Sequence, residues 1–376
     1  MLRRRALSTL ATGFAATLGL PALAQNDRRI VLGQSCALSG PAAQLGLQMN
    51  RGAKIFFDRL NAQGGINGRT IDLRSLDDGY EPDRCRANTE QFVKDDVFAL
   101  FGYVGTPTSL AALPLVNAAK IPFFGPFTGA EALRDPFSRY VFHVRASYYD
   151  ETAVIVKQLT SLGLTRIAVC RQNDSYGQAG LDGVVRALAK LKLEPVAVGT
   201  VERNSVDVAA AVQAIVPKMP NAVVQIGAYK GCAAFIRAAR KAGFGGTFYN
   251  VSFVGTQALA DELGRDGLGV VVSQVMPFPF STTTAIAREY IDAVRQTGGD
   301  ATANYSSMEG YVAAKVFAEG VRRAGGPVTR DALINALESL QRFDLGGFQV
   351  NFSARDHQGS DFVDVSMLTG DGKVRR

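Results

Sequence analysis

Short apolar segments alternate with longer amphipathic segments along almost the whole chain, and this alternation constrains the fold more than any other feature. In the first half, strands are expected at residues 29–35, 70–78, 97–102 and 121–126, with helices at 41–61, 82–94 and 107–119. The pattern then restarts, with strands at 166–172, 194–201, 222–227, 247–253 and 268–275 and helices at 150–162, 177–190, 206–216 and 230–242. Parallel strands need helical crossovers, so this order predicts an α/β fold of two doubly wound parallel sheets.

The first 24 residues (1–24) have the pattern of an export signal peptide. A basic start at Arg3, Arg4 and Arg5 precedes an apolar stretch that ends in Ala22-Leu23-Ala24, a small-x-small cleavage site. We expect cleavage after Ala24 and export by the Sec or the twin-arginine route. The remaining chain has no second apolar run that could span a bilayer, and its length favours two domains.

Charge and composition argue against several classes of function. The 41 Lys and Arg residues outnumber the 34 Asp and Glu residues, but they are scattered, so no nucleic-acid-binding surface is expected. The chain has only two histidines, His143 and His357, which are too few to favour a histidine metal site or a catalytic triad. We therefore expect no cofactor.

The four cysteines are far apart and contain no Cys-x-x-Cys motif, which argues against a metal site. An exported chain can oxidise its thiols, and two disulfides within the halves are one alternative. Four free buried thiols are the other. The pairs concerned would be Cys36 with Cys85 and Cys170 with Cys232.

Five loops directly follow apolar strands, and ligands of parallel sheets bind beyond the carboxyl ends of the strands. The loops are GYVGTPTS (102–109), GPFTGA (125–130), NDSYGQ (173–178), GAYKG (227–231) and NVSFVG (250–255). The first lacks the lysine of a phosphate-binding loop, and the last has Asn250 in place of the first glycine of a nucleophile elbow. These loops therefore predict a binding cleft, and we do not expect an enzyme.

Four segments carry a resemblance to a known family: LSGPAAQLG (38–46), INGRTIDLRSLDDGYEP (66–82), NDSYGQAGLDGV (173–184) and IRAARKAGF (236–244). In their order and spacing the chain resembles the Leu/Ile/Val-binding-type (type I) periplasmic substrate-binding proteins of ABC importers. The resemblance implies two lobes joined by three crossings, near Arg145–Ser147, Met276–Pro279 and Gly346–Val350. Lobe 1 would then comprise residues 28–146 plus 277–346, including helices at 286–297, 305–324 and 330–340, and lobe 2 residues 147–276 plus 347–376.

The resemblance also implies a function. Proteins of this family close their lobes around a small molecule in the periplasm and present it to a membrane permease, without chemistry of their own. We expect a monomer that binds a carboxylate or an amino acid. A sensing module of the same fold, without transport, is an alternative.

Site residues follow from the resemblance as well. Gly105 and Thr106 would hold the ligand carboxylate at the start of a helix, where unpaired N–H groups favour an anion. Thr106 could instead serve only as the helix N-cap. A second anion-holding loop would use the Thr128 hydroxyl or the backbone of its neighbours. The further candidates on these loops and on the facing lobe are Tyr103, Phe127, Gly129, Tyr149, Tyr176, Tyr229 and Phe253.

Two departures from the family pattern bear on the ligand. Leu45 replaces an aromatic wall residue, and Ser252 stands where amino-acid binders place a glutamate for the ammonium group. A buried ammonium without a carboxylate partner is costly. We therefore expect an organic carboxylate, aromatic in view of the tyrosines and phenylalanines around the loops. A plain amino acid is the alternative, with its anchor supplied by Asp150, Asp174 or Glu202.

Overall fold

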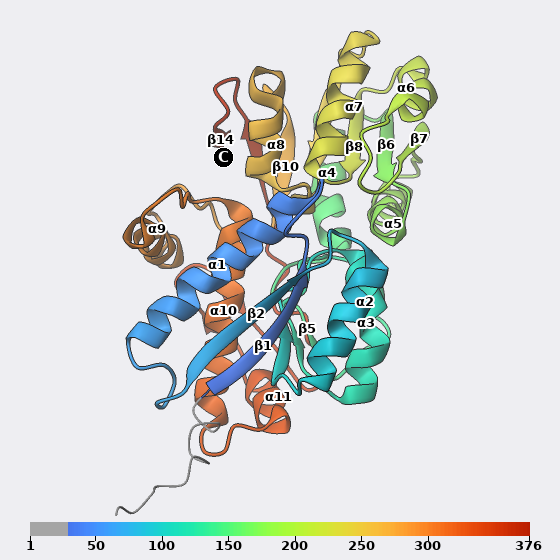
Figure 1. The fold of residues 1–376 in the computed structure, drawn as a ribbon. Helices are drawn as coiled ribbons and strands as arrows, with labels where there is room; N and C mark the ends of the chain where they lie inside the picture. The colour runs from blue at the N-terminus through green and yellow to red at the C-terminus, as the bar shows by residue number, and fades with distance from the viewer. Residues whose placement is uncertain (1–28) are drawn as a thin grey trace, which may run out of the picture.

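The structure, a computed structural model, describes residues 29–376. The predicted export signal at residues 1–24 lies outside this range. Figure 1 shows two α/β lobes stacked on one another, with the chain passing between them more than once. No helix within 29–376 is long and apolar enough to cross a membrane.

The first lobe contains a five-stranded parallel sheet in the order β2-β1-β3-β4-β5. Its strands are β1 (Arg29–Cys36), β2 (Thr70–Asp77), β3 (Ala99–Phe101), β4 (Phe123–Phe124) and β5 (Val141–Phe142). The helices of this lobe are α1 (Ala43–Ala62), α2 (Pro82–Lys94), α3 (Thr106–Ala119), α9 (Ala285–Thr297), α10 (Tyr305–Ala324) and α11 (Arg330–Glu338). The three C-terminal helices α9, α10 and α11 lie beside the first sheet (Figure 1).

Helices α1 and α10 pack closely because each presents a glycine to the other. A Cβ atom at Gly52 would clash with the Ser307 carbonyl, and one at Gly310 would clash with the Met49 carbonyl. Fifteen of the 20 residues of α10 are buried. This packing fixes the helix that carries Glu309, a residue of the site described below.

The second lobe contains a seven-stranded sheet in the order β14-β13-β10-β9-β8-β6-β7. Its strands are β6 (Ile167–Gln172), β7 (Ala197–Val201), β8 (Ala222–Ile226), β9 (Thr247–Asn250), β10 (Val271–Gln274), β13 (Asp364–Leu368) and β14 (Val374–Arg375). The helices are α4 (Tyr148–Ser161), α5 (Ser175–Ala189), α6 (Ala209–Ile215), α7 (Tyr229–Lys241) and α8 (Thr256–Leu263). Both lobes are thus α/β units built on parallel strands, as predicted.

Two details of the second lobe differ from the prediction. The last two strands, β13 and β14, are antiparallel to their neighbours, so this sheet is mixed. The strand expected over 247–253 ends at Asn250, and the chain turns through a 3₁₀ segment into α8, a helix that the sequence did not predict.

The third crossing lies later than the expected Gly346–Val350. Gly346 and Gly347 have φ values of 91° and 100° and form the turn of a small hairpin between β11 (Phe343–Asp344) and β12 (Gln349–Val350). The chain then stays on the first lobe, because the Gly359 N–H donates to the His143 carbonyl at 2.7 Å. Residues 351–359 therefore belong with lobe 1, and the chain leaves it between residue 359 and the start of β13.

All four cysteines are buried and free, which is the second of the two alternatives considered for them.

Candidate functional site

The loops at the carboxyl ends of both sheets face one another, and the two lobes are in contact there. The Gln172 side-chain amide of lobe 2 donates to the Tyr80 hydroxyl of lobe 1 at 3.2 Å. The Phe253 ring of lobe 2 lies 5.4 Å from the Phe127 ring of lobe 1, between centroids. Leu45 of α1 contacts Gly255, where a Cβ atom would not fit. The structure therefore shows the lobes closed on each other.

Two threonine hydroxyls meet at the start of α3. The Thr106 Oγ1 lies 2.6 Å from the Thr128 Oγ1, and the Thr128 Oγ1 donates to the Tyr148 hydroxyl at 3.3 Å. Gly105 is the N-cap of α3 with φ 102°, and Thr106 makes no capping bond, so the N-cap alternative for Thr106 is wrong. The first N–H groups of a helix have no partner within it, so donors and hydroxyls converge here. We call this group the hydroxyl end of the site.

The Phe127 ring lies in the contact between the lobes, whereas its backbone, which the sequence analysis considered for the ligand, is hydrogen-bonded within lobe 1. Its N–H donates to the Tyr103 carbonyl at 2.7 Å, and its own carbonyl accepts from the Gly105 N–H at 3.2 Å. Gly129 follows Thr128, and its carbonyl accepts from the Tyr148 N–H at 2.7 Å. A Cβ atom at Gly129 would press on Tyr148, so the glycine allows that tyrosine to approach.

An aromatic cluster from both lobes covers the hydroxyl end. The Tyr176 ring lies 5.3 Å from the Tyr148 ring and 4.6 Å from the Phe253 ring, between centroids. Phe253 in turn contacts Phe127 and Tyr80. All five rings are buried. Of the predicted residues, the structure thus brings together Thr106, Thr128, Phe127, Tyr176 and Phe253.

The Tyr103, Tyr149 and Tyr229 side chains do not join this cluster. The Tyr103 hydroxyl lies 3.1 Å from the Thr89 hydroxyl and its ring packs on Phe123, in a separate apolar core beneath α2. Tyr149 lies under the Arg186 guanidinium on the surface of α4. The Tyr229 hydroxyl lies near the backbone of Gln44 in α1, across the contact between the lobes.

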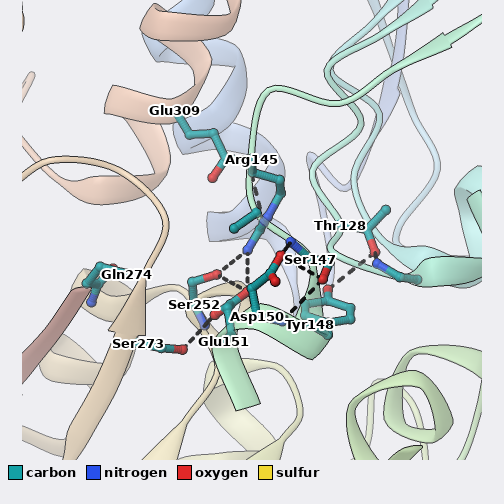
Figure 2. Close-up of polar contacts among 12 residues, drawn as sticks. Thr128, Arg145, Ser147, Tyr148, Asp150, Glu151, Ser252, Ser273, Gln274 and Glu309 are labelled. Atoms are coloured by element: carbon teal, nitrogen blue, oxygen red, sulfur yellow. Dashed lines mark hydrogen bonds and ion pairs between the residues drawn. The ribbon is translucent and has the colours of Figure 1, made fainter. Parts of the chain in front are cut away.

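A buried group of charged side chains lies at the first crossing between the lobes, and Figure 2 shows it. The Arg145 Nη2 is 3.1 Å from the Glu151 Oε1 of lobe 2, and its Nη1 is 3.5 Å from the Glu309 Oε1 of lobe 1. The Arg145 Nη2 also donates to the Ser252 hydroxyl. Arg145 thus connects both lobes from within the crossing.

The two carboxylates of this group differ in how fully they are bonded. Glu151 accepts from the Ser252 N–H at 2.7 Å, the Ser252 hydroxyl at 3.0 Å and the Ser273 hydroxyl at 2.6 Å. Within residues 29–376, Glu309 has Arg145 as its one ion-pair partner and makes no hydrogen bond. Burial raises the pKa of Glu309 to about 7, against the opposing effect of Arg145.

The argument from Ser252 about the ligand needs correction. The three alternative anchors are all engaged locally: Asp150 in the capping box of α4, Asp174 in the N-cap of α5, and Glu202 with Asn173. Ser252 nevertheless has the Glu151 carboxylate bonded to it and lines a cavity with Glu309. A serine at position 252 therefore does not by itself exclude an ammonium group.

The sequence analysis assigned no role to the side chains of Arg145, Glu151, Glu309 or Tyr80. Their positions lie far apart in the chain, and only the packing of two lobes brings them together. One signal was present: Glu309 is an acidic residue shortly before the apolar run Tyr311–Ala314 of a predicted helix. An ionisable residue on an apolar helix face is rarely buried without a partner.

No histidine reaches Ser252. The His143 Nε2 lies 3.0 Å from the Leu133 carbonyl, and the His357 Nδ1 lies 3.0 Å from the Val141 carbonyl, both inside lobe 1. The described residues contain no cluster of His, Cys, Asp and Glu that could hold a metal ion. The site can therefore bind through hydroxyls, N–H groups, rings and a carboxylate.

Hydrogen bonds at the rim of the cleft join the closed lobes. The Arg203 Nη2 lies 2.7 Å from the Glu81 Oε2, and the Asn204 amide donates to the Glu81 Oε1 at 2.7 Å and to the Gly79 carbonyl at 3.1 Å. Arg203 and Asn204 follow β7 in lobe 2, whereas Gly79 and Glu81 precede α2 in lobe 1. These bonds break when the lobes separate.

We predict that Arg203→Ala shifts the ligand-free protein toward an open arrangement. A partly exposed ion pair contributes up to about 1 kcal/mol, so the ratio of closed to open protein should fall by about twofold to fivefold. Small-angle scattering would show a larger radius of gyration. Arg237→Ala is the control, because Arg237 pairs with Asp266 inside lobe 2. Identical scattering of Arg203→Ala and wild type would contradict the prediction.

Comparisons with known proteins agree with this architecture. A sequence profile of the family described as "Periplasmic binding protein" matches residues 29–373. The chain is similar to a solved structure of a possible leucine/isoleucine/valine-binding protein from Rhodopirellula baltica, with 36% identity, a TM-score of 0.89, and coverage of 93% of this chain and 96% of that one. A substrate-binding periplasmic protein from Ralstonia solanacearum is 32% identical, with a TM-score of 0.87 and coverage of 92% and 99%.

A curated relative, Leu/Ile/Val-binding protein homolog 7 of Brucella suis, is 24% identical over 84% of this chain and 82% of its own length.

Proposed function

The chain belongs to the periplasmic binding proteins of the Leu/Ile/Val-binding type, and we propose that it captures a small organic carboxylate between its lobes and delivers it to the permease of an ABC importer. One observation carries the choice of ligand class. The hydroxyls of Thr106 and Thr128 meet at the first turn of α3, under rings from both lobes. Hydroxyls and free N–H groups at a helix start suit a carboxylate, and the rings suit a flat apolar body.

The two halves of the site come from different lobes, and this division supports a mechanism of capture by closure. Lobe 1 supplies Thr106, Thr128 and Phe127, and lobe 2 supplies Tyr148, Tyr176 and Phe253. A ligand touches both sets only when the lobes close, so it stabilises the closed arrangement. A shift from 1:99 to 99:1 needs about 5.5 kcal/mol of differential binding. The closed form would be the one presented to the permease.

The charge at the crossing argues against Arg145 as the partner of the ligand carboxylate. Arg145 already has two carboxyl groups within 3.5 Å, and these offset its charge. An anion placed there would meet Glu151 and Glu309. The hydroxyl end contains no acidic side chain among its hydrogen-bond partners and is the better place for an anion.

Amino-acid binding is a second candidate function because two carboxyl groups lie close to Ser252. An α-ammonium group could then be bound without a glutamate at position 252. Export to the periplasm through cleavage of residues 1–24 is part of the proposal for either ligand.

A thermal-shift screen of the mature protein tests the proposal. The compounds would be amino acids, aliphatic acids, aromatic acids and uncharged sugars. Ligand at 100 times its dissociation constant adds about 2.7 kcal/mol of stability and raises the unfolding temperature by several degrees. We expect shifts from carboxylates without an α-amino group, largest for aromatic acids. Shifts from α-amino acids alone would favour the second candidate, and shifts from sugars alone would contradict both.

A further inference from the structure

We infer that the site has a second subsite beside the crossing between the lobes, in which the Glu309 carboxyl receives a hydrogen-bond-donating group of the solute. The donor would be a hydroxyl or an ammonium group at the end of the molecule opposite its carboxylate. This inference rests on the proposed function, and it narrows the ligand class to elongated acids with a donor at the far end.

A small cavity of about 10 Å³, roughly the space of one water-sized group, lies at this point beside the aromatic cluster. Phe127 belongs to both the aromatic cluster and the cavity wall. The other lining residues are Ser252, Gln274, Val275, Met276, Tyr305, Ser306 and Glu309. Figure 2 shows Glu309, Gln274 and Ser252 around this space. The cavity therefore extends the site toward the crossing.

Glu309 has unused capacity to accept hydrogen bonds. An ionised carboxylate offers about four acceptor positions, and burial without hydrogen bonds is costly. Within residues 29–376, Glu309 has one ion-pair contact, at 3.5 Å, while Glu151 accepts several hydrogen bonds. The Gln274 amide cannot serve Glu309, because its nitrogen already donates to Thr256 and Ser366. A donor on the ligand would satisfy Glu309.

The charge balance selects a donor over a second anion. Arg145 faces two carboxyl groups, so another negative group would be repelled, whereas a hydroxyl would be accepted and an ammonium attracted. The raised pKa of Glu309, about 7, reflects the cost of its burial. A bound donor would lower that cost by stabilising the ionised form.

The position of Arg145 sets the length of the ligand. Figure 2 places Arg145 between Thr128 of the hydroxyl end and Glu309. The Phe127 ring lies 5.0 Å from the Arg145 guanidinium and lines the cavity beside Glu309. The polar groups of the ligand must therefore be farther apart than the single carbon atom that separates them in an α-amino acid.

Titration calorimetry of the mature protein with two matched series of acids tests the inference. The first series is benzoate, 4-hydroxybenzoate and 4-(aminomethyl)benzoate; the second is valerate, 5-hydroxyvalerate and 5-aminovalerate. In at least one series we expect a donor-bearing acid to bind about 10- to 100-fold more tightly than the plain acid, the usual gain for a hydrogen bond to a charged group. Glu309→Leu should abolish that gain, so that the donor-bearing acid binds this variant no more tightly than the plain acid of the same series does.

Glu319 on the same helix pairs with Arg322 and Arg323 at the surface, so Glu319→Leu is the matched control and should keep the gain. If Glu309→Leu does not fold, the isosteric Glu309→Gln should reduce the preference for an ammonium by about tenfold. Equal binding of plain and donor-bearing acids by wild type, or an unchanged preference in the folded Glu309 variant, would overturn the inference while the proposed function stands. Binding of no acid at all would overturn both.

Discussion

Replacing Arg145 with methionine is expected to destabilise the protein by about 3–5 kcal/mol, which is the usual cost of breaking a buried ion pair by removing one partner. Arg145 and Glu151 are 1% and 0% exposed, and Glu309 is 4% exposed. Without the guanidinium, two carboxyl groups would remain buried with no cation between them. The pKa of Arg145 is raised because the two carboxyl groups outweigh the effect of its burial.

Urea unfolding followed by circular dichroism measures this loss. Arg139→Met is the control, because Arg139 pairs with Asp331 at the surface and should cost less than about 1 kcal/mol. Adding Glu151→Gln and Glu309→Gln to Arg145→Met should recover part of the stability, since no uncompensated charge would then remain. A loss below 1 kcal/mol for Arg145→Met alone would show that the group is not the electrostatic centre of the crossing.

The second large effect is expected on binding. Valine at both positions 106 and 128 keeps the shape of threonine but removes the two hydroxyls that lie 2.6 Å apart. Hydrogen bonds to a charged group contribute about 1.5–3 kcal/mol each, so the double variant Thr106→Val/Thr128→Val should bind a carboxylate at least about 100-fold more weakly.

Calorimetry with the tightest acid from the screen measures this loss. Thr89→Val is the matched control, because the Thr89 hydroxyl is equally buried but pairs with Tyr103 in the core below α2. The control should bind as wild type does. If the double variant bound the acid within about threefold of wild type, the carboxylate would have to lie elsewhere.

Most of the fold was predictable because strand and helix periods are local properties of the sequence. The bounds of α2 and α10 agree with the predicted ranges 82–94 and 305–324. The errors arose where tertiary contacts, and not the local sequence pattern, determine the local structure. Gly346 and Gly347 were expected at a crossing between the lobes. Instead, the Asp344 carboxylate accepts hydrogen bonds from both of their N–H groups and closes a hairpin turn. Helix α8 is only 8 residues long and lies between two apolar segments, so the sequence pattern did not reveal it.

The site was predictable where it depends on the edge of a sheet, and not where it depends on the contact between lobes. Thr106, Thr128 and Tyr176 follow strands directly, so topology alone brings them to one cleft. Arg145 and Glu309 are 164 positions apart and belong to a crossing and to a helix of the returning segment. Their meeting depends on how α10 packs against α1 and on the relative position of the two lobes, which no local pattern specifies.

The most direct test of the central proposal is a crystal structure of the mature protein with the tightest acid from the screen. We predict closed lobes, with one carboxylate oxygen of the ligand within hydrogen-bond distance of Thr106 Oγ1 and Thr128 Oγ1 and facing the first N–H groups of α3. A carboxylate bound to Arg145 instead, with the threonine hydroxyls still paired to each other, would contradict the assignment of the hydroxyl end as the anion site.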